Sequence, residues 1–439
     1  MEEFVVVMSD PTDGYTRAAT SFFGKDTARL GGPEAWVIWL LATAFVVWLF
    51  AIQTGYAIVS PQIQEDAGLS LAQVSAAASV YTVFFAIFQF FSGSLLDRYG
   101  TRPLLALAVA LVTVGAFLYA ATSGFGMLVL AQIVLALGAS FGFVGAGYVG
   151  GKWFDAARYG LMFGLVQMCA SVGSAIGQPT ISALLELMTW KQLLAGFASA
   201  GVLLTIAFGF LVRDPAPAPG TARIARPTTN VWVGILRNLR ACIGNRQVVL
   251  SALFAGAAFG TMLSVGVLWG PRVQDARGAS SGFAAVLTAL AWLGMAFGAP
   301  LVNVVSNRWH SRRRPAVIGL LLQAVAVTLF IYGPANGPGA SMVVMFAVGL
   351  FAGTHMLGFT VAGESVSPNL IGSSAAVVNG VCFIVGGALQ VIPGYLLPND
   401  PTLGDFRAAL WVMPVVLVLG ALAALALRDS IPGKAADPG

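Results

Sequence analysis

The feature that most constrains the fold of this chain is a series of apolar stretches that starts near Trp36 and recurs almost to the C-terminus. Each is long enough to cross a membrane, because about 20 apolar residues in a helix span the hydrocarbon core of a bilayer. The stretches lack the polar–apolar alternation of membrane barrel strands. The sequence therefore predicts an all-α membrane protein with twelve transmembrane helices. Their expected limits are 36–59, 72–96, 103–123, 125–150, 159–186, 192–212, 247–270, 282–306, 315–334, 341–363, 370–397 and 407–427.

The composition excludes several classes of protein. Hydrophobic residues make up 58% of the chain and charged residues only 9%, whereas soluble domains carry about 25% charged residues. This excludes a water-soluble enzyme, a disordered protein and a nucleic-acid binder. The chain holds two histidines and three widely separated cysteines, which favours neither a metal site nor a disulfide framework. We expect no catalytic residues, no metal and no cofactor.

Lysine and arginine are distributed unevenly between the two sides of the predicted membrane. If the N-terminal tail lies inside, 19 of the 23 basic residues fall in inner segments and 4 in outer ones. Positive charge stays on the cytoplasmic side of membrane proteins. We therefore expect both termini in the cytoplasm, and we interpret the net charge of +5 as a topology signal rather than as a site for a polyanion. The expected location is the bacterial inner membrane.

The two halves of the chain resemble each other. The segment that ends the first span, SPQIQEDAGLS, matches GPRVQDARGAS after the seventh, and an offset of 210 residues also carries DRYGTR (97–102) onto NRWHSR (307–312). An offset of 212 pairs Gly160 with Gly372, Gln167 with Asn379, and Gln178 with Gln390. Two parallel six-helix repeats are typical of secondary transporters that rock about a central site. We predict an N-terminal tail (1–34), a six-helix bundle (35–212), a cytoplasmic linker (213–246), a second, pseudo-symmetric bundle (247–428) and a C-terminal tail (429–439).

The loop between the second and third spans carries a family resemblance. GSLLDRYGTRP (93–103) resembles the signature loop of the major facilitator superfamily, Gly-x-Leu-x-Asp-Arg-x-Gly-x-Arg. The resemblance implies the fold of that family, transport by alternating access across the bilayer, and a monomer. It also implies that Asp97 faces the N-terminus of the eleventh helix, in the other half, where the helix dipole favours an anion.

These residues predict a gate on the cytoplasmic side. Arginines near Asp97 could bridge to acidic groups or carbonyls across the seam between the halves, although the run Arg312–Arg314 is better interpreted as a topology anchor. The candidate gate residues are Gly93, Asp97, Arg98, Gly100, Arg102, Arg158, Asn307, Arg308, Arg312 and Glu364.

A second stretch suggests a branch of the family. Residues 151–179 resemble the organic-solute branch, which includes oxalate/formate antiporters, monocarboxylate transporters and the amino-acid and nucleoside importers of intracellular bacteria. The drug/proton antiporter pattern is broken, because Val134 stands where those proteins have Arg and Thr180 follows Pro179. Uptake of a small metabolite is therefore favoured over efflux of lipophilic compounds, which remains the alternative. A solute sensor that does not transport is a second alternative.

The predicted spans contain no charged residue away from their ends. A dianion would need a cationic partner in the membrane, so a neutral, zwitterionic or monocarboxylate solute fits better. Uncharged polar and aromatic residues within the spans are the candidates to bind it, or else they hydrogen-bond between helices. These candidates are Gln53, Tyr56, Tyr81, Gln89, Gln132, Gln167, Gln178, Trp292, His355, Asn379 and Gln390.

One ionisable side chain lies well inside a predicted span. Histidine titrates near neutral pH, so His355 is a candidate proton carrier and protons are a candidate coupling ion. Glu364, at the membrane edge, is the alternative carrier. Without either, the protein would be a uniporter or an exchanger.

Overall fold

The computed structural model describes residues 30–215, 230–333, 337–398 and 401–429. Within them it contains twelve helices, or groups of helices, that are long and apolar enough to cross a membrane. No strand occurs in this part of the chain. The predicted fold class is confirmed. The N-terminal tail, much of the linker and nearly all of the C-terminal tail lie outside the described residues.

The spans follow the predicted order. The first half contains α1 (Pro33–Asp66), α2 (Leu71–Tyr99), α3 (Thr101–Ala120), α4 (Phe125–Ala139) with α5 (Gly142–Trp153), α6 (Tyr159–Leu185) and α7 (Trp190–Leu211). The second half contains α9 (Arg246–Ser264) with the π-helical turn η3 (Val265–Trp269) and α10 (Gly270–Asp275), α11 (Ser281–Arg308), α12 (Arg313–Tyr332), α13 (Gly337–Ala352) with η4 (Gly353–His355) and α14 (Met356–Glu364), α15 (Ile371–Val391), and α16 (Leu403–Leu410) with α17 (Val412–Leu425). Short 3-10 turns flank α6 and α15, namely η2 (Ala156–Arg158), η5 (Pro368–Leu370) and η6 (Pro393–Leu396).

The repeated segment after the first and seventh spans is a repeated turn. Gly68 and Gly278 both adopt a positive φ, of 61° and 80°, a conformation that glycine accepts without steric cost. Two residues later, the hydroxyls of Ser70 and Ser280 accept hydrogen bonds from backbone N–H groups in the first turns of α2 and α11. The matching residues thus specify the end of one helix and the N-cap of the next, once in each half.

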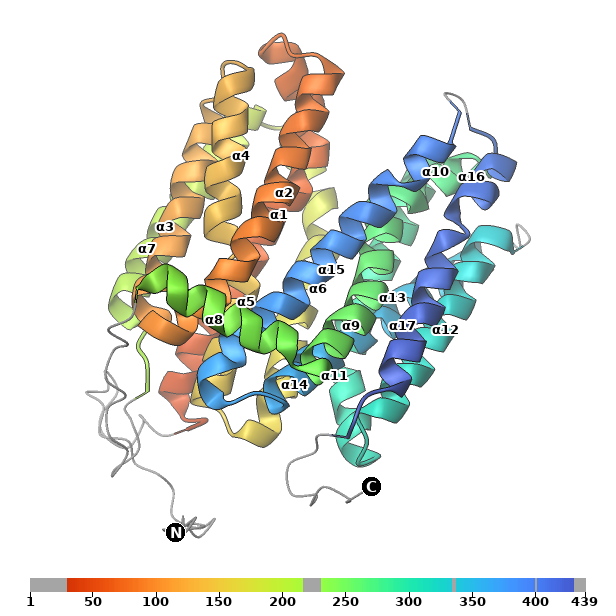
Figure 1. Cartoon of the computed structure of the whole chain (residues 1–439). Helices are drawn as coiled ribbons and strands as arrows, with labels where there is room; N and C mark the ends of the chain where they lie inside the picture. The colour runs from red at the N-terminus through yellow and green to blue at the C-terminus, as the bar shows by residue number, and fades with distance from the viewer. Residues whose placement is uncertain (1–29, 216–229, 334–336, 399–400, 430–439) are drawn as a thin grey trace, which may run out of the picture.

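The two halves meet at one end of the bundle and separate at the other (Figure 1). Two helix pairs provide most of the contact between them, because α2 packs against α15 and α6 packs against α11. The two pairs are equivalent in the repeat. The second span, α2, corresponds to the eighth, α11, and the fifth span, α6, corresponds to the eleventh, α15. α1 begins and α17 ends at the end where the halves meet, which we call the closed end (Figure 1). The opposite end is the open end. The domain limits, and the side of the membrane that each end faces, stay predictions.

One helix was not expected from the sequence. α8 (Val231–Gly244) lies within the predicted linker and runs across the bundle rather than along it (Figure 1). Its apolar residues follow the spacing of an amphipathic helix, including Trp232, Ile235, Leu239 and Cys242. That spacing could have predicted it, but α8 is too short to stand out among transmembrane spans.

Candidate functional site

A cavity of about 440 Å³ lies between the two halves, toward the open end. Its wall comes from α1, α2, α3 and α4 of the first half and from α9, η3, α10, α11 and α15 of the second. Both halves therefore contribute side chains to one site, as a carrier that rocks about its site requires. The volume falls within the range of small-molecule pockets, about 300–1,000 Å³.

Six of the predicted binding residues line this cavity: Gln53, Tyr56, Tyr81, Gln132, Trp292 and Gln390. The Tyr56 hydroxyl donates to the carbonyl oxygen of Val74 at 2.7 Å. Its ring stacks on that of Tyr119, with centroids 5.9 Å apart.

The other predicted binding residues lie outside the cavity wall in this conformation. Gln89 and Gln167 are buried and donate to serines one turn away on their own helices, Ser92 and Ser171. Asn379 is also buried, and His355 packs with its Nδ1 2.8 Å from the carbonyl oxygen of Ala352. Gln178 lies on α6, but its side chain is outside the described part of the chain. Their role in binding stays a prediction.

Three hydrogen-bond donors of the cavity wall have no partner. They are the hydroxyl of Tyr119, the amide Nε2 of Gln132 and the indole Nε1 of Trp292. A buried donor without a partner costs about 1–3 kcal/mol, so a solute acceptor that paired with any of these donors would be bound favourably. Tyr119 was not among the predicted binding residues. It lies near the end of its span, where tyrosine commonly anchors the membrane interface, and only the fold turns it toward the cavity.

Among the described residues that line the cavity, Asp275 is the only charged one. It lies beyond the predicted span 247–270, which holds no charged residue away from its ends. Asp275 ends α10 and is exposed, so it lies at the mouth rather than in the interior. Arg272, one turn before it, is exposed and lies over the ring of Trp269.

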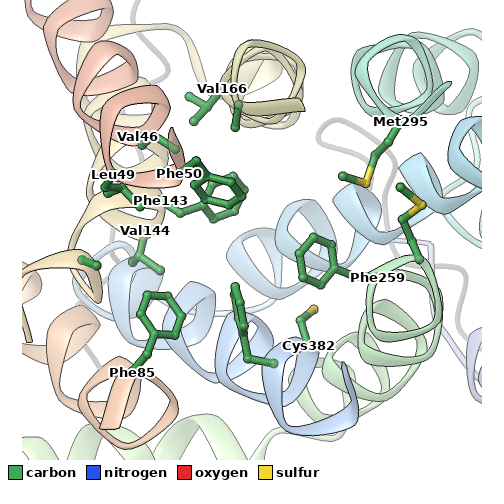
Figure 2. Packing of buried hydrophobic residues seen from close by; sticks show 14 of the residues in the cluster. Val46, Leu49, Phe50, Phe85, Phe143, Val144, Val166, Phe259, Met295 and Cys382 are labelled. Atoms are coloured by element: carbon green, nitrogen blue, oxygen red, sulfur yellow. The ribbon is translucent and has the colours of Figure 1, made fainter. Parts of the chain in front are cut away.

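Aromatic side chains separate the cavity from the closed end. The rings of Phe85 and Phe383, which belong to opposite halves, have centroids 4.6 Å apart, and Phe259 lies 5.5 Å from Phe383. Figure 2 shows Phe85 and Phe259 turned toward the middle of the bundle from opposite sides. His355 packs behind this layer, with its ring 5.0 Å from that of Phe259.

At the closed end, the carboxylate of Asp97 accepts three hydrogen bonds from the first turn of α15. The backbone N–H groups of Gly372 and Ser373 donate at 2.9 and 2.8 Å, and the Ser373 hydroxyl donates at 2.6 Å. These N–H groups have no partner within their helix, and the positive end of the helix dipole faces the carboxylate. This is the contact that the resemblance implied between the two halves. Its action as a gate stays a prediction.

The helices beside Asp97 touch through their backbones. Gly93 packs against Gly372 so closely that a Cβ at Gly93 would collide with the Gly372 carbonyl. The second crossing also depends on a small residue, because a Cβ at Gly164 would collide with the backbone at Ala299 and Pro300.

Arg102 and Arg312 form contacts within their own halves, whereas the expected gate would have them bridge the seam. Arg102 donates to the carbonyl oxygen of Gly209 in its own half. Arg312 forms an ion pair with Glu364 at 2.7 Å within the second half, and it is too deeply buried to be the simple topology anchor that the run of arginines suggested. The Arg98 guanidinium lies beside Gly234 of α8.

The remaining gate candidates occupy peripheral positions. Asn307 accepts a hydrogen bond from Arg312 rather than capping α6 as Asp97 caps α15. Arg158 and Arg308 are exposed. Gly100 adopts a φ of 80° at the start of α3. The gate residues of the two halves are therefore not equivalent.

Two equivalent aspartates, one in each half, were not among the predicted residues. Asp214, after α7, accepts hydrogen bonds from the N–H (3.0 Å) and hydroxyl (2.6 Å) of Thr101. Asp429, after α17, accepts from the N–H groups of Arg312 at 2.7 Å and Arg313 at 3.0 Å. Each carboxylate thus caps the third helix of its own half and ties it to the sixth. The shared dipeptide Arg-Asp, at 213–214 and 428–429, was the available signal.

Comparison with known proteins agrees with this architecture. The family model described as Major Facilitator Superfamily matches residues 38–391. The hexuronate transporter of Bacillus subtilis (strain 168) is 24% identical over 88% of this chain and 92% of its own length. A probable L-galactonate transporter of Escherichia coli (strain K12) is 24% identical, with coverage of 94% and 95%. A probable sulfoacetate transporter of Cupriavidus necator is 22% identical, with coverage of 87% and 90%. The expected oxalate/formate or amino-acid/nucleoside branch is not confirmed by these relatives.

Proposed function

Because this chain belongs to the major facilitator superfamily, whose members are transporters and not enzymes, we propose that it carries a small hydroxylated organic solute, neutral or with a single carboxylate. The solute binds in the cavity between the halves and crosses the membrane by alternating access. The observation that carries the proposal is the set of unpaired donors on Tyr119, Gln132 and Trp292, in a wall whose described residues include no lysine or arginine.

The chemistry of these donors defines the solute. A hydroxyl, an amide N–H and an indole N–H all seek acceptors, which are the oxygens of hydroxyl and carboxylate groups. Neutral donors can compensate a single carboxylate in part. Two carboxylates in a pocket without a cation would leave charge uncompensated, at a high cost in free energy.

The relatives support the same class. Hexuronate and L-galactonate, which name two of the relatives, are sugar acids with one carboxylate and several hydroxyls. Sulfoacetate, which names the third, carries two acidic groups. We expect this chain to prefer solutes of the first kind.

Uptake into proteoliposomes tests the proposal. Labelled hexuronate, galactonate, a simple monocarboxylate, a neutral amino acid, a nucleoside and sulfoacetate would be offered with and without a pH gradient. We expect uptake of one of the singly charged or neutral solutes, competed by others of its class and not by sulfoacetate. Preferred uptake of sulfoacetate would contradict the proposed class. The pH gradient tests proton coupling, for which His355 and Glu364 stay the predicted carriers.

The cavity wall also favours a second candidate function. Much of it is apolar, with Leu49, Phe50 and Ile52 from α1 and Leu263 from α9, which would suit efflux of a lipophilic compound. Competition by lipophilic compounds but not by the hydroxylated solutes would favour efflux. Binding without any flux would favour a sensor.

The two unpaired nitrogen donors give a direct prediction. Gln132→Leu and Trp292→Phe each remove one donor and introduce an apolar side chain of similar shape. We expect each to weaken binding of the transported solute about tenfold, since a hydrogen bond to a charged group contributes about 1.5–3 kcal/mol. The change is measured as the Kd of the purified protein for that solute.

Matched controls lie outside the cavity. Gln323 donates to the carbonyl oxygen of Ala258, and Trp269 donates to that of Leu389. Gln323→Leu and Trp269→Phe are the same substitutions at buried positions. Each removes a hydrogen bond to a backbone carbonyl, and neither residue lines the cavity. Equal losses of affinity in the controls and in the cavity variants would show that stability, and not contact with solute, explains the effect.

A further inference from the structure

The linker helix α8 presents a surface that transport does not explain. Asn230 caps it, accepting a hydrogen bond from the Trp232 N–H at 3.0 Å. α8 then packs against α2 of the first half and against α15 and α9 of the second. It therefore lies over the seam that Asp97 closes (Figure 1).

The bundle covers only part of the apolar side of α8. Ile235 and Cys242 are buried against the bundle. Trp232, Leu236 and Ile243 are 64%, 63% and 54% exposed. Their spacings of four and seven residues place them in one stripe along the helix. A short helix does not leave three large apolar side chains in water without cost, so this stripe needs a partner.

Basic residues run beside the stripe. Arg237 and Arg240 are exposed, and α8 contains no acidic residue. A helix with a tryptophan and leucine stripe next to arginines is the pattern of helices that lie in the headgroup region of a bilayer. Arginine near an anionic membrane surface is attracted by its lipids.

The stripe continues an exposed apolar surface of a predicted membrane span. The ring of Trp232 contacts that of Phe91 on α2, with centroids 6.0 Å apart. Ile87 and Val83, one and two turns before Phe91 on the same side of this span, are 46% and 54% exposed. The apolar surface therefore runs from a membrane span onto α8. This continuity favours the bilayer over a soluble protein as the partner of the stripe.

We propose that α8 docks on the surface of an anionic bilayer and is thereby held against the seam between the two halves. Trp232, Leu236 and Ile243 enter the boundary between headgroups and acyl chains. Arg237 and Arg240 bind the phosphate groups of anionic lipids.

Cys242 provides a reporter for this docking. It lies on the face of α8 that packs against the bundle, and burial raises the pKa of its thiol to about 12. A maleimide reagent, which needs the thiolate, therefore reaches it only when α8 lifts. The full chain with Cys169→Ser and Cys382→Ser would be placed in nanodiscs of phosphatidylcholine alone or with phosphatidylglycerol. We expect phosphatidylglycerol to slow labelling of Cys242 about tenfold, as two arginines at an anionic surface predict.

Neutralising the arginines separates docking from general stability. In R237Q/R240Q the slowing by phosphatidylglycerol should disappear. In R313Q/R314Q, which neutralises two other exposed arginines of the closed end, it should persist. Equal labelling rates in the two bilayers would overturn the proposal. So would a phosphatidylglycerol effect that survives in R237Q/R240Q, or one that is lost equally in R313Q/R314Q.

Discussion

Replacing Gly93 with alanine should prevent the closed end from closing and should abolish transport. The added methyl group would collide with the carbonyl of Gly372, and a backbone neighbour cannot move aside as a side chain can. Overpacking costs about 1–3 kcal/mol even in an apolar core, and about 1.4 kcal/mol changes an equilibrium tenfold. The halves would separate by enough to pull Gly372 and Ser373 away from Asp97, so the three hydrogen bonds of that carboxylate would be lost together.

The distance between spin labels across the seam measures this effect. Labels at Ala157 and Arg313, which are exposed at the closed end on opposite halves, would be attached in a chain whose native cysteines are replaced by serine. We expect G93A to shift the distance distribution to longer values and to stop uptake. G196A is the control, because a Cβ at Gly196 on α7 meets nothing within 4 Å. An unchanged distribution with normal uptake in G93A would show that close contact at Gly93 is not needed for closure.

The spans and the position of Asp97 at the end of α2 could be predicted because each depends on local sequence. A stretch of apolar residues is sufficient to indicate a membrane helix, and the signature loop places an acidic residue where α2 ends. The contact with α15 came only from the family resemblance, since nothing near Asp97 in the sequence indicates Gly372. The π-helical turn at 265–269 has no such signal and was not predicted.

The cavity wall was predicted only in part because helix packing, not residue type, decides which polar side chains line it. Gln132 and Gln167 are both glutamines in the middle of spans, yet Gln132 lines the cavity while Gln167 bonds to Ser171 within α6. Their sequence environments do not distinguish them. Tyr119 was missed for the same reason.

The arginines of the closed end show a further limit of sequence reasoning. Arg312, Arg313 and Arg314 are adjacent and identical in type, but the first is buried and the other two are exposed. The difference arises because the carboxylate of Glu364, 52 residues later at the end of α14, accepts a hydrogen bond from Arg312 at the start of α12. A contact over that separation cannot be read from charge counting.

Replacing Arg312 with leucine should strongly destabilise the second half. The side chains of Arg312 and Glu364 are only 4% and 12% exposed. Loss of one member deprives the other buried charge of its ion pair, which costs about 3–5 kcal/mol. We expect R312L and E364L each to lower the apparent Tm of the purified protein by several degrees. R313L, an exposed neighbour, should change it little.

The double variant R312L/E364L distinguishes a coupled pair from two independent contacts. Two leucines leave no unpaired charge, so the double variant should be more stable than either single one, and the coupling should amount to about 0.5–3 kcal/mol. Additive losses would contradict a coupled pair.

Because both residues belong to the second half, these variants should leave the distance between labels at Ala157 and Arg313 unchanged. G93A should do the opposite, shifting that distance with little loss of Tm, since the methyl group strains only the contact between the halves. Together these results would show that Asp97 and the glycines join the halves at the closed end, whereas the Arg312 pair stabilises the second half alone.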